Sequence, residues 1–201
     1  KELFSIRYWN RTLLLWILWC SLIYTYYGVF LWLPTIYYTK LGYKIVKTLE
    51  WTLVVTLAQI PGYYSAALML DKVGRKPILS VYLLIAGVAC LLLGTTRNLD
   101  LILLYSLVVS FFNLGAWSAL YTYTPELYPT RIRGTGAGAA SSVGRIAGIL
   151  APVVTGYLMT ISRGEIAWAF ALFALVHWVA AFTVLLLGEE TRRRKLEEIA
   201  E

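Results

Sequence analysis

The sequence has few charged residues, which make up 14% of it, whereas they make up about 25% of a typical soluble domain. It also has a single histidine, His177, and two cysteines, Cys20 and Cys90. The cysteines fit no zinc-ligand or disulfide spacing, so we expect both to be small buried apolar residues. We expect His177 to be a hydrogen-bonded packing residue, with proton handling as the alternative role. This shortage of metal ligands and of nucleophile–base pairs predicts that the protein is not an enzyme.

Hydrophobic residues are abundant instead, at 59% of the chain, and they gather in long tracts. Splitting the chain at its charged residues, with Arg145 as the one interruption, leaves six tracts, at 12–39, 51–70, 77–96, 101–125, 134–162 and 166–188. Each is about 20 residues or longer, which lets a helix cross a hydrocarbon core of about 30 Å. Because lipid cannot hydrogen-bond to the backbone, each tract is expected to be helical. The predicted fold class is an all-α membrane protein, a six-transmembrane-helix bundle.

The distribution of cations predicts how this bundle sits in the membrane. Residues 1–11 form a lead-in segment, residues 12–188 the transmembrane domain and residues 189–201 a tail, and six spans place both ends on one side. That side carries twelve of the cations and the other side five, with Arg145 in between. By the positive-inside rule the lead-in and the tail are cytoplasmic. The net charge of +7 then reflects topology, and we expect no binding of nucleic acid.

Two short loops on the predicted cytoplasmic side carry complementary charges. The first reads DKVGRKP, where Gly74 allows a tight turn and Pro77 can lie in the first turn of the next helix. The second reads PELYPTRIRGTG. We expect a charge network that holds the inner face closed and releases it on opening, formed by Asp71, Arg75, Glu126, Arg131 and Arg133. The alternative is a pair of loops whose cations only fix the topology.

Arg145 is a permanent cation in the middle of the fifth tract. If the helix begins near residues 136–138, Arg145 lies roughly 11–14 Å along it, close to the middle of the bilayer. An arginine at this depth costs about 2.5–3.5 kcal/mol to insert, so it is expected to face protein or a water-filled cavity. No Asp or Glu lies at comparable depth in the sequence. Its partner is water and carbonyl groups, an acid outside these residues, or a substrate carboxylate, which a guanidinium binds through two hydrogen bonds.

Polar and aromatic residues recur at helical spacing in three other tracts. Such spacing places residues on one face of a helix. The recurring sets are Asn113, Trp117 and Tyr121; Gln59 and Tyr63; and Tyr24 and Tyr27. Aromatic rings with amide donors can stack on and hydrogen-bond to a flat heteroaromatic acid, although ordinary packing is the alternative for any one ring.

The fifth tract is rich in glycine as well. Gly144 and Gly148 form a G-x-x-x-G pattern, which lets a neighbouring helix approach closely. Pro61 and Pro152 are expected to interrupt the second and fifth spans and can bend them. The stretch GTGAG follows an arginine-rich turn and no strand, so it does not predict a phosphate-binding loop.

Taken together, these motifs resemble the C-terminal half, spans seven to twelve, of a major facilitator superfamily transporter. The resemblance covers essentially the whole chain and rests on DKVGRKP, PELYPTRIRG, SSVGRIAGILAPVVTG and the ending GEETRRRKLEEI. Two stretches, YYGVFLWLPTIYYTKLG and TLAQIPGYYSAALMLDKVGRK, are similar to the bacterial niacin-transporter group, a relative of the organic-ion porters and synaptic-vesicle glycoproteins. One departure is Ala67, where the family's loop motif often has glycine.

The resemblance implies a secondary transporter that works by alternating access, with the substrate at the midplane between two six-helix bundles. It implies that the first, second, fourth and fifth tracts line the cavity, and that the position of Arg145 is typically basic in anion carriers. The candidate substrate-binding residues are therefore Arg145, Asn113, Trp117, Tyr121, Gln59, Tyr63, Tyr24 and Tyr27.

The expected substrate is a small organic anion, nicotinate or a similar aromatic carboxylate, and proton coupling is implied by the family. No cofactor is expected. The expected partners are the lipid bilayer and an N-terminal six-helix half that these residues do not include, in a bacterial cell membrane. The alternatives are a sugar or drug porter of the same superfamily and a membrane scaffold that transports nothing.

Overall fold

The computed structural model describes residues 2–39 and 41–193, so the part of the predicted tail beyond residue 193 lies outside the described residues. The described segments are helical: η1 (Glu2–Phe4), α1 (Trp9–Thr39), α2 (Ile45–Leu57), α3 (Gln59–Val73), α4 (Arg75–Thr95), α5 (Leu99–Glu126), α6 (Thr130–Ile161) and α7 (Ile166–Leu187). Within them, six segments are long and apolar enough to span a membrane, with α2 and α3 forming one span. The predicted all-α bundle of six spans is confirmed.

The helices extend beyond the apolar tracts that predicted them. Helix α1 begins at Trp9, inside the predicted lead-in segment, and α2 begins at Ile45, before the second tract. The tracts were bounded by charged residues, but Arg11 and Lys47 continue the helices at their ends. Arginine and lysine are good helix formers, and their long side chains reach water from the edge of a membrane.

The second span is broken between α2 and α3, at Ala58. The break lies just before Pro61, whose ring nitrogen has no hydrogen to donate to the carbonyl group of Leu57. The next helical hydrogen bond, from the N–H of Gly62 to the carbonyl of Ala58, is long at 3.4 Å. By contrast, α6 runs unbroken through Pro152. The expected interruption is therefore present in the second span, whereas the fifth span remains a continuous helix.

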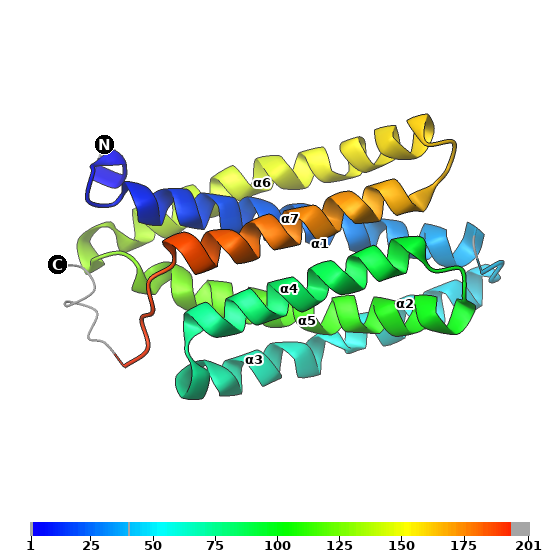
Figure 1. Cartoon of the computed structure of the whole chain (residues 1–201), viewed down its shortest axis with the longest axis horizontal. Helices are drawn as coiled ribbons and strands as arrows, with labels where there is room; N and C mark the ends of the chain where they lie inside the picture. The colour runs from blue at the N-terminus through cyan, green and yellow to red at the C-terminus, as the bar shows by residue number, and fades with distance from the viewer. Residues whose placement is uncertain (1, 40, 194–201) are drawn as a thin grey trace.

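The spans lie side by side along the long axis of the molecule (Figure 1). Helix α4 packs on α5 and α7, α1 packs on α6 and α7, and α3 packs on α5. At one end of the bundle lie η1, the α3–α4 and α5–α6 turns and the residues that follow α7 (Figure 1). We call this end the charged end, because it carries Asp71, Arg75 and Glu126, and we call the opposite end the far end. Helix α6 and the α2–α3 span are the least buried.

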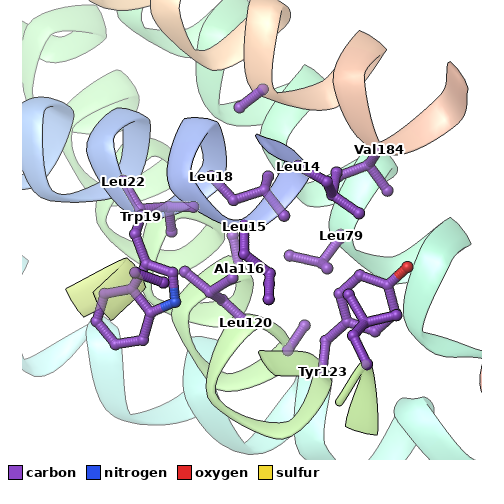
Figure 2. Close-up of a cluster of buried hydrophobic side chains, with 14 of the residues drawn as sticks. Leu14, Leu15, Leu18, Trp19, Leu22, Leu79, Ala116, Leu120, Tyr123 and Val184 are labelled. Atoms are coloured by element: carbon purple, nitrogen blue, oxygen red, sulfur yellow. The ribbon is translucent and has the colours of Figure 1, made fainter. Parts of the chain in front are cut away.

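Two clusters of buried hydrophobic side chains form the core. One lies in the half of the bundle toward the charged end and joins α1, α4, α5 and α7 through residues such as Leu15, Leu79 and Leu120 (Figure 2). The other lies toward the far end, around Tyr37 and Phe173. Both clusters combine aliphatic and aromatic side chains, and most of their members lie on α1, α4, α5 and α7, which form the packed centre of the bundle.

Glycine residues set the contact between α6 and α1. A Cβ atom at Gly144 would lie 3.1 Å from the carbonyl carbon of Trp19, and one at Gly148 would lie 2.8 Å from Cγ2 of Ile23. Only glycine leaves room for so close an approach, as the G-x-x-x-G pattern predicts. Arg145 is one of the three residues between the two glycines, and it lines the same cavity as Trp19 and Ile23 of α1.

Candidate functional site

A cavity of about 490 Å³ opens between α1, α3, α5 and α6. It is lined by Trp19, Ile23, Tyr26, Tyr27, Tyr63, Leu114, Trp117, Tyr121, Ser141 and Arg145. Its volume is typical of small-molecule sites, which span about 300–1,000 Å³. The four spans that line it are the first, second, fourth and fifth.

Arg145 enters this cavity from the middle of α6. Its side chain is exposed and forms no hydrogen bond or ion pair with any described residue. Ser141, one helical turn earlier on α6, also lines the cavity, and its hydroxyl group has no described partner. A cation and a hydroxyl group therefore face the same space from one helix, both available to a ligand.

Aromatic rings form the opposite wall of the cavity. The rings of Trp117 and Tyr121 on α5 lie 5.4 Å apart at an angle of 32°. Trp19 on α1 meets both rings edge-on, at 5.6 Å from Trp117 and 5.4 Å from Tyr121. Tyr26 adds an edge contact to Trp117 at 6.5 Å. This wall presents the faces and edges of several rings, a surface on which a flat aromatic molecule can stack.

Four tyrosines line the cavity, Tyr26, Tyr27, Tyr63 and Tyr121. Tyr27, Tyr63 and Tyr121 form no hydrogen bond with a described residue. Away from the cavity, Tyr123 donates to the carbonyl of Glu189 at 2.6 Å, and the hydroxyl of Tyr128 is bonded to that of Thr12. The polar atoms of the cavity are thus free to bind a polar ligand.

The structure brings five of the eight predicted substrate-binding residues to this cavity: Arg145, Trp117, Tyr121, Tyr63 and Tyr27. Asn113 lies outside it and is completely buried. Each step of four residues turns a helix about 40° past a full turn, so Asn113 is rotated about 80° from Tyr121. Its amide group instead donates to Thr25 of α1 at 3.3 Å and to His177 of α7 at 3.0 Å.

Tyr24 and Gln59 also lie outside the cavity. The ring of Tyr24 packs edge-on against Phe173 of α7 at 5.9 Å, and its hydroxyl group is buried without a partner. The side chain of Gln59 is half-buried at the start of α3, directly after the break in the second span. Each residue precedes by one turn a tyrosine that lines the cavity, Tyr27 and Tyr63.

His177 is completely buried and hydrogen-bonded, as expected of a packing residue. Its Nδ1 lies 2.8 Å from the carbonyl oxygen of Phe173, which can only accept, so Nδ1 carries a proton. Its Nε2 then accepts the hydrogen bond from Asn113. Thr25, Asn113 and His177 thus link α1, α5 and α7 through buried polar groups.

At the charged end, Arg75 and Glu126 form an ion pair between α4 and α5. Nη2 of Arg75 lies 2.9 Å from Oε1 of Glu126, and Nε donates to Oε2 at 3.1 Å. Only 13% of the Arg75 side chain and 16% of the Glu126 side chain are exposed. Oδ1 of Asp71 is 3.1 Å from Nη1 of Arg75, but the Asp71 side chain is 85% exposed, so this ion pair contributes little to stability.

The segment after α7 contributes to this cluster, which the sequence reasoning missed. Glu190 accepts hydrogen bonds from the backbone N–H groups of Arg75, at 3.0 Å, and Lys76, at 3.1 Å, and so caps the start of α4. The hydroxyl of Thr191 donates to Oε2 of Glu126 at 2.5 Å. The available signal was the pair of acids directly after the last apolar tract, on the same side as the basic loops.

Arg131 and Arg133 do not contact Glu126, because the first turn of α6 directs them to other groups. Arg131 pairs with Glu2 of η1. Nε of Arg133 donates to the carbonyl of Tyr128 at 3.3 Å. Of the five residues of the predicted charge network, the structure brings together Asp71, Arg75 and Glu126 and places the two arginines of α6 nearby but apart.

A six-span helical bundle with a cavity open on one side, lined by an unpaired arginine and aromatic rings, has the architecture of one half of a membrane transporter. The family model for sugar (and other) transporters matches residues 1–201, so the chain belongs to that family. The family is one of transporters, so the chain is part of a transporter and not of an enzyme.

Two bacterial relatives carry niacin-transporter names. The niacin transporter NiaP of Acinetobacter baylyi is 42% identical over 199 residues, which cover 99% of this chain and 45% of that protein. A Bacillus subtilis protein provisionally named a niacin/nicotinamide transporter is 41% identical over 199 residues, which cover 98% of this chain and 49% of that protein. The chain therefore spans about half the length of the curated relatives it matches.

A solved structure shows the same fold. The major facilitator superfamily proton:xylose symporter XylE, bound to 6-bromo-6-deoxy-D-glucose, superposes with a TM-score of 0.77 and 20% sequence identity. The match covers 91% of this chain and 41% of XylE. The predicted fold, one half of a major facilitator superfamily transporter in an integral membrane protein, is confirmed.

Proposed function

We propose that the full-length protein moves a small organic anion across the membrane, with nicotinate or a similar aromatic carboxylate as its substrate. The observation that carries this proposal is the unpaired guanidinium of Arg145 in a cavity walled by Trp117 and Tyr121. A guanidinium can bind a carboxylate through two parallel hydrogen bonds, while the aromatic wall can stack on a flat ring. The names of the two bacterial relatives support nicotinate as the choice among aromatic acids.

The proposed mechanism is alternating access between this bundle and a second six-helix bundle of the full-length protein. The cavity has walls on α1, α3, α5 and α6, so a partner bundle is needed to enclose a substrate. The match covers 45% and 49% of the two bacterial relatives, so about half of each relative lies outside the match, enough for a second bundle of this size. No Asp or Glu is among the described residues that line the cavity, so an acid that couples transport to protons would lie in the other half.

In this proposal the charged end faces the cytoplasm of a bacterial cell, as the excess of cations there favours. The Arg75–Glu126 pair, with Glu190 and Thr191, holds the cytoplasmic end of the bundle in one arrangement and rearranges when that end opens. Ion pairs that are shielded from water suit such a role, because breaking one costs free energy. The bundle then has two distinct arrangements, one with the pair formed and one with it broken.

The test is uptake of labelled nicotinate by cells that express the complete gene or its Arg145→Ala variant. We expect the variant to lose at least about tenfold in uptake, because a charge-assisted hydrogen bond is removed from the substrate. Excess benzoate should compete with nicotinate and lower its uptake, whereas nicotinamide, which has no carboxylate, should not. Arg97→Ala is the matched control, since Arg97 is an exposed arginine at the far end with no ion pair to a described residue.

Two results would contradict the proposal. Normal uptake by the Arg145→Ala variant, at equal amounts of protein in the membrane, would assign Arg145 to a structural role. Failure of the unaltered protein to take up nicotinate would leave the transporter fold standing but would remove nicotinate as its substrate.

A further inference from the structure

Among the described residues, Trp19 is the one whose ring contacts both aromatic rings on the α5 wall of the cavity, those of Trp117 and Tyr121. Its ring is edge-on to Trp117 at 81° and to Tyr121 at 88°. Its backbone lies against Gly144, so a larger residue on α6 would push against Trp19 itself. Trp19 therefore lies between the aromatic wall on α5 and the segment of α6 that carries Arg145.

The orientation of the Trp19 ring is fixed by Thr124. The indole N–H of Trp19 donates to Oγ1 of Thr124 at 3.0 Å, and both residues are buried. The hydroxyl of Thr124 donates its own hydrogen to the carbonyl of Leu120 at 2.7 Å, which leaves its oxygen free to accept from the indole. An indole N–H can only donate, so one buried acceptor is enough to select one orientation of the ring.

This hydrogen bond is not a general feature of the tryptophans in the bundle. Nε1 of Trp16, one turn before Trp19 on α1, is buried without any partner. A tryptophan can thus pack in this bundle with its N–H unsatisfied, although that costs free energy. Trp178 also has an acceptor, since its Nε1 donates to the carbonyl of Leu84 at 3.4 Å, but the acceptor of Trp19 is a side-chain hydroxyl group that a substitution can remove.

We propose that Thr124 is a positioning residue for substrate binding: its hydroxyl group holds the Trp19 ring in place against Trp117 and Tyr121, and so sets the shape of the aromatic wall. This inference rests on the proposed function, because it concerns the same cavity. Thr124 itself does not line the cavity and acts only through Trp19. Without the hydroxyl, the indole ring turns to other orientations and the wall fits a flat anion less well.

Three substitutions separate this role from simple packing. Thr124→Val keeps the shape of the side chain and removes the acceptor, whereas Thr124→Ser keeps the hydroxyl group. Thr155→Val is the matched control, because Thr155 is as deeply buried as Thr124, at 1% exposure, and its hydroxyl donates to the carbonyl of Ala151 at the same distance of 2.7 Å. Thr155 has no tryptophan partner and does not line the cavity.

The first measurement is nicotinate uptake by cells that express the complete gene. We expect Thr124→Val to raise KM about three- to tenfold, the worth of one neutral hydrogen bond, with the maximal rate little changed. Thr124→Ser should restore the original KM, and Thr155→Val should leave it unchanged. Equal KM values for the two valine variants would overturn the proposal, as would a Thr124→Ser variant that behaves like Thr124→Val.

The second measurement needs no substrate and keeps the inference separate from the proposed function. A maleimide reagent labels the Ser141→Cys variant at the cavity, in a Cys20→Ala background that removes the half-buried cysteine near Trp19. We expect Thr124→Val to change the labelling rate severalfold and Thr155→Val to leave it unchanged. If nicotinate is not a substrate, the proposed function fails, and the labelling rates still decide the role of Thr124: identical rates in both valine variants overturn it.

Discussion

Arg75 and Glu126 lie 51 residues apart in the chain, and their side chains meet at 2.9 Å between the start of α4 and the end of α5. Water reaches little of either side chain, and Thr191 donates a further hydrogen bond to Glu126. The pair and Thr191 therefore join three separate parts of the chain at the charged end.

Removing one partner of this pair should destabilise the protein strongly. Loss of one member of a buried ion pair costs about 3–5 kcal/mol, because the remaining charge is left without a partner. We expect Arg75→Gln and Glu126→Gln each to lower the free energy of unfolding by about 3 kcal/mol. This is the lower end of that range, since both side chains keep some contact with water. Thermal unfolding of the detergent-purified full-length protein measures the loss.

The double variant and an exposed control make this prediction sharper. Arg75→Gln combined with Glu126→Gln should be less destabilising than the sum of the two single changes, because no charge is left unpaired. Asp71→Asn should change the stability by less than about 1 kcal/mol, as expected for an exposed ion pair. Additive effects at Arg75 and Glu126 would show that the two side chains do not interact in the membrane protein.

Gly74 is predicted to tolerate no other residue. Its φ of +116° with ψ of 163° belongs to a region that is open essentially to glycine alone, and an added Cβ would lie 2.5 Å from Oε2 of Glu190. We expect Gly74→Ala to cost about 1–3 kcal/mol and to disturb the cap on α4. Gly42→Ala, at φ +63° with nothing within 4 Å of the added Cβ, should cost less, and unfolding midpoints of the two variants test the difference.

The approach of α6 to α1 should depend on Gly144. An added methyl group there would press on the backbone of Trp19 and on Ile23, and overpacking of this kind costs about 1–3 kcal/mol. Because α6 also carries Arg145, we expect Gly144→Ala to lower both the unfolding temperature and nicotinate uptake. Gly138→Ala, which meets nothing within 4 Å, should lower neither. Equal behaviour of the two variants would show that α6 does not pack on α1 through its glycines.

The polar link between Asn113 and His177 should matter for stability. Asn113→Leu leaves Nε2 of His177 buried without a donor, which costs about 1–3 kcal/mol. Adding His177→Phe to that variant should recover part of the loss, since both polar partners are then replaced by apolar groups. Unfolding by heat of Asn113→Leu, His177→Phe and the double variant measures the coupling, and a second substitution that only adds to the loss would contradict it.

The six spans could be predicted because a membrane span leaves a strong signal in the sequence: a long apolar tract bounded by charge. The G-x-x-x-G contact and the glycine turn at Gly74 could be predicted for a similar reason, since each depends on one residue type at one position. The helix ends could not, because the tracts were cut at charged residues, whereas Arg11 and Lys47 continue the helices.

The site was harder to predict, because helical spacing places residues on a face but does not say which neighbour that face meets. Asn113 lies two four-residue steps before Tyr121 but is turned toward α1 and α7, where it donates to Thr25 and His177. Trp19 gave no signal at all, since one tryptophan in an apolar tract looks like packing until Thr124 is seen beside it. Contacts between distant segments, such as Glu190 with Arg75, depend on how the bundle closes and not on any local pattern.

The cap that Glu190 places on α4 also has a consequence for biogenesis. The ribosome adds Glu190 only 115 residues after Arg75, when α4 has long been made. Until α7 has emerged and entered the membrane, the first N–H groups of α4 lack this carboxylate, and Glu126 lacks the hydroxyl of Thr191. The hydrogen bonds that Glu190 and Thr191 make at the charged end can therefore form only after all six spans have been synthesised.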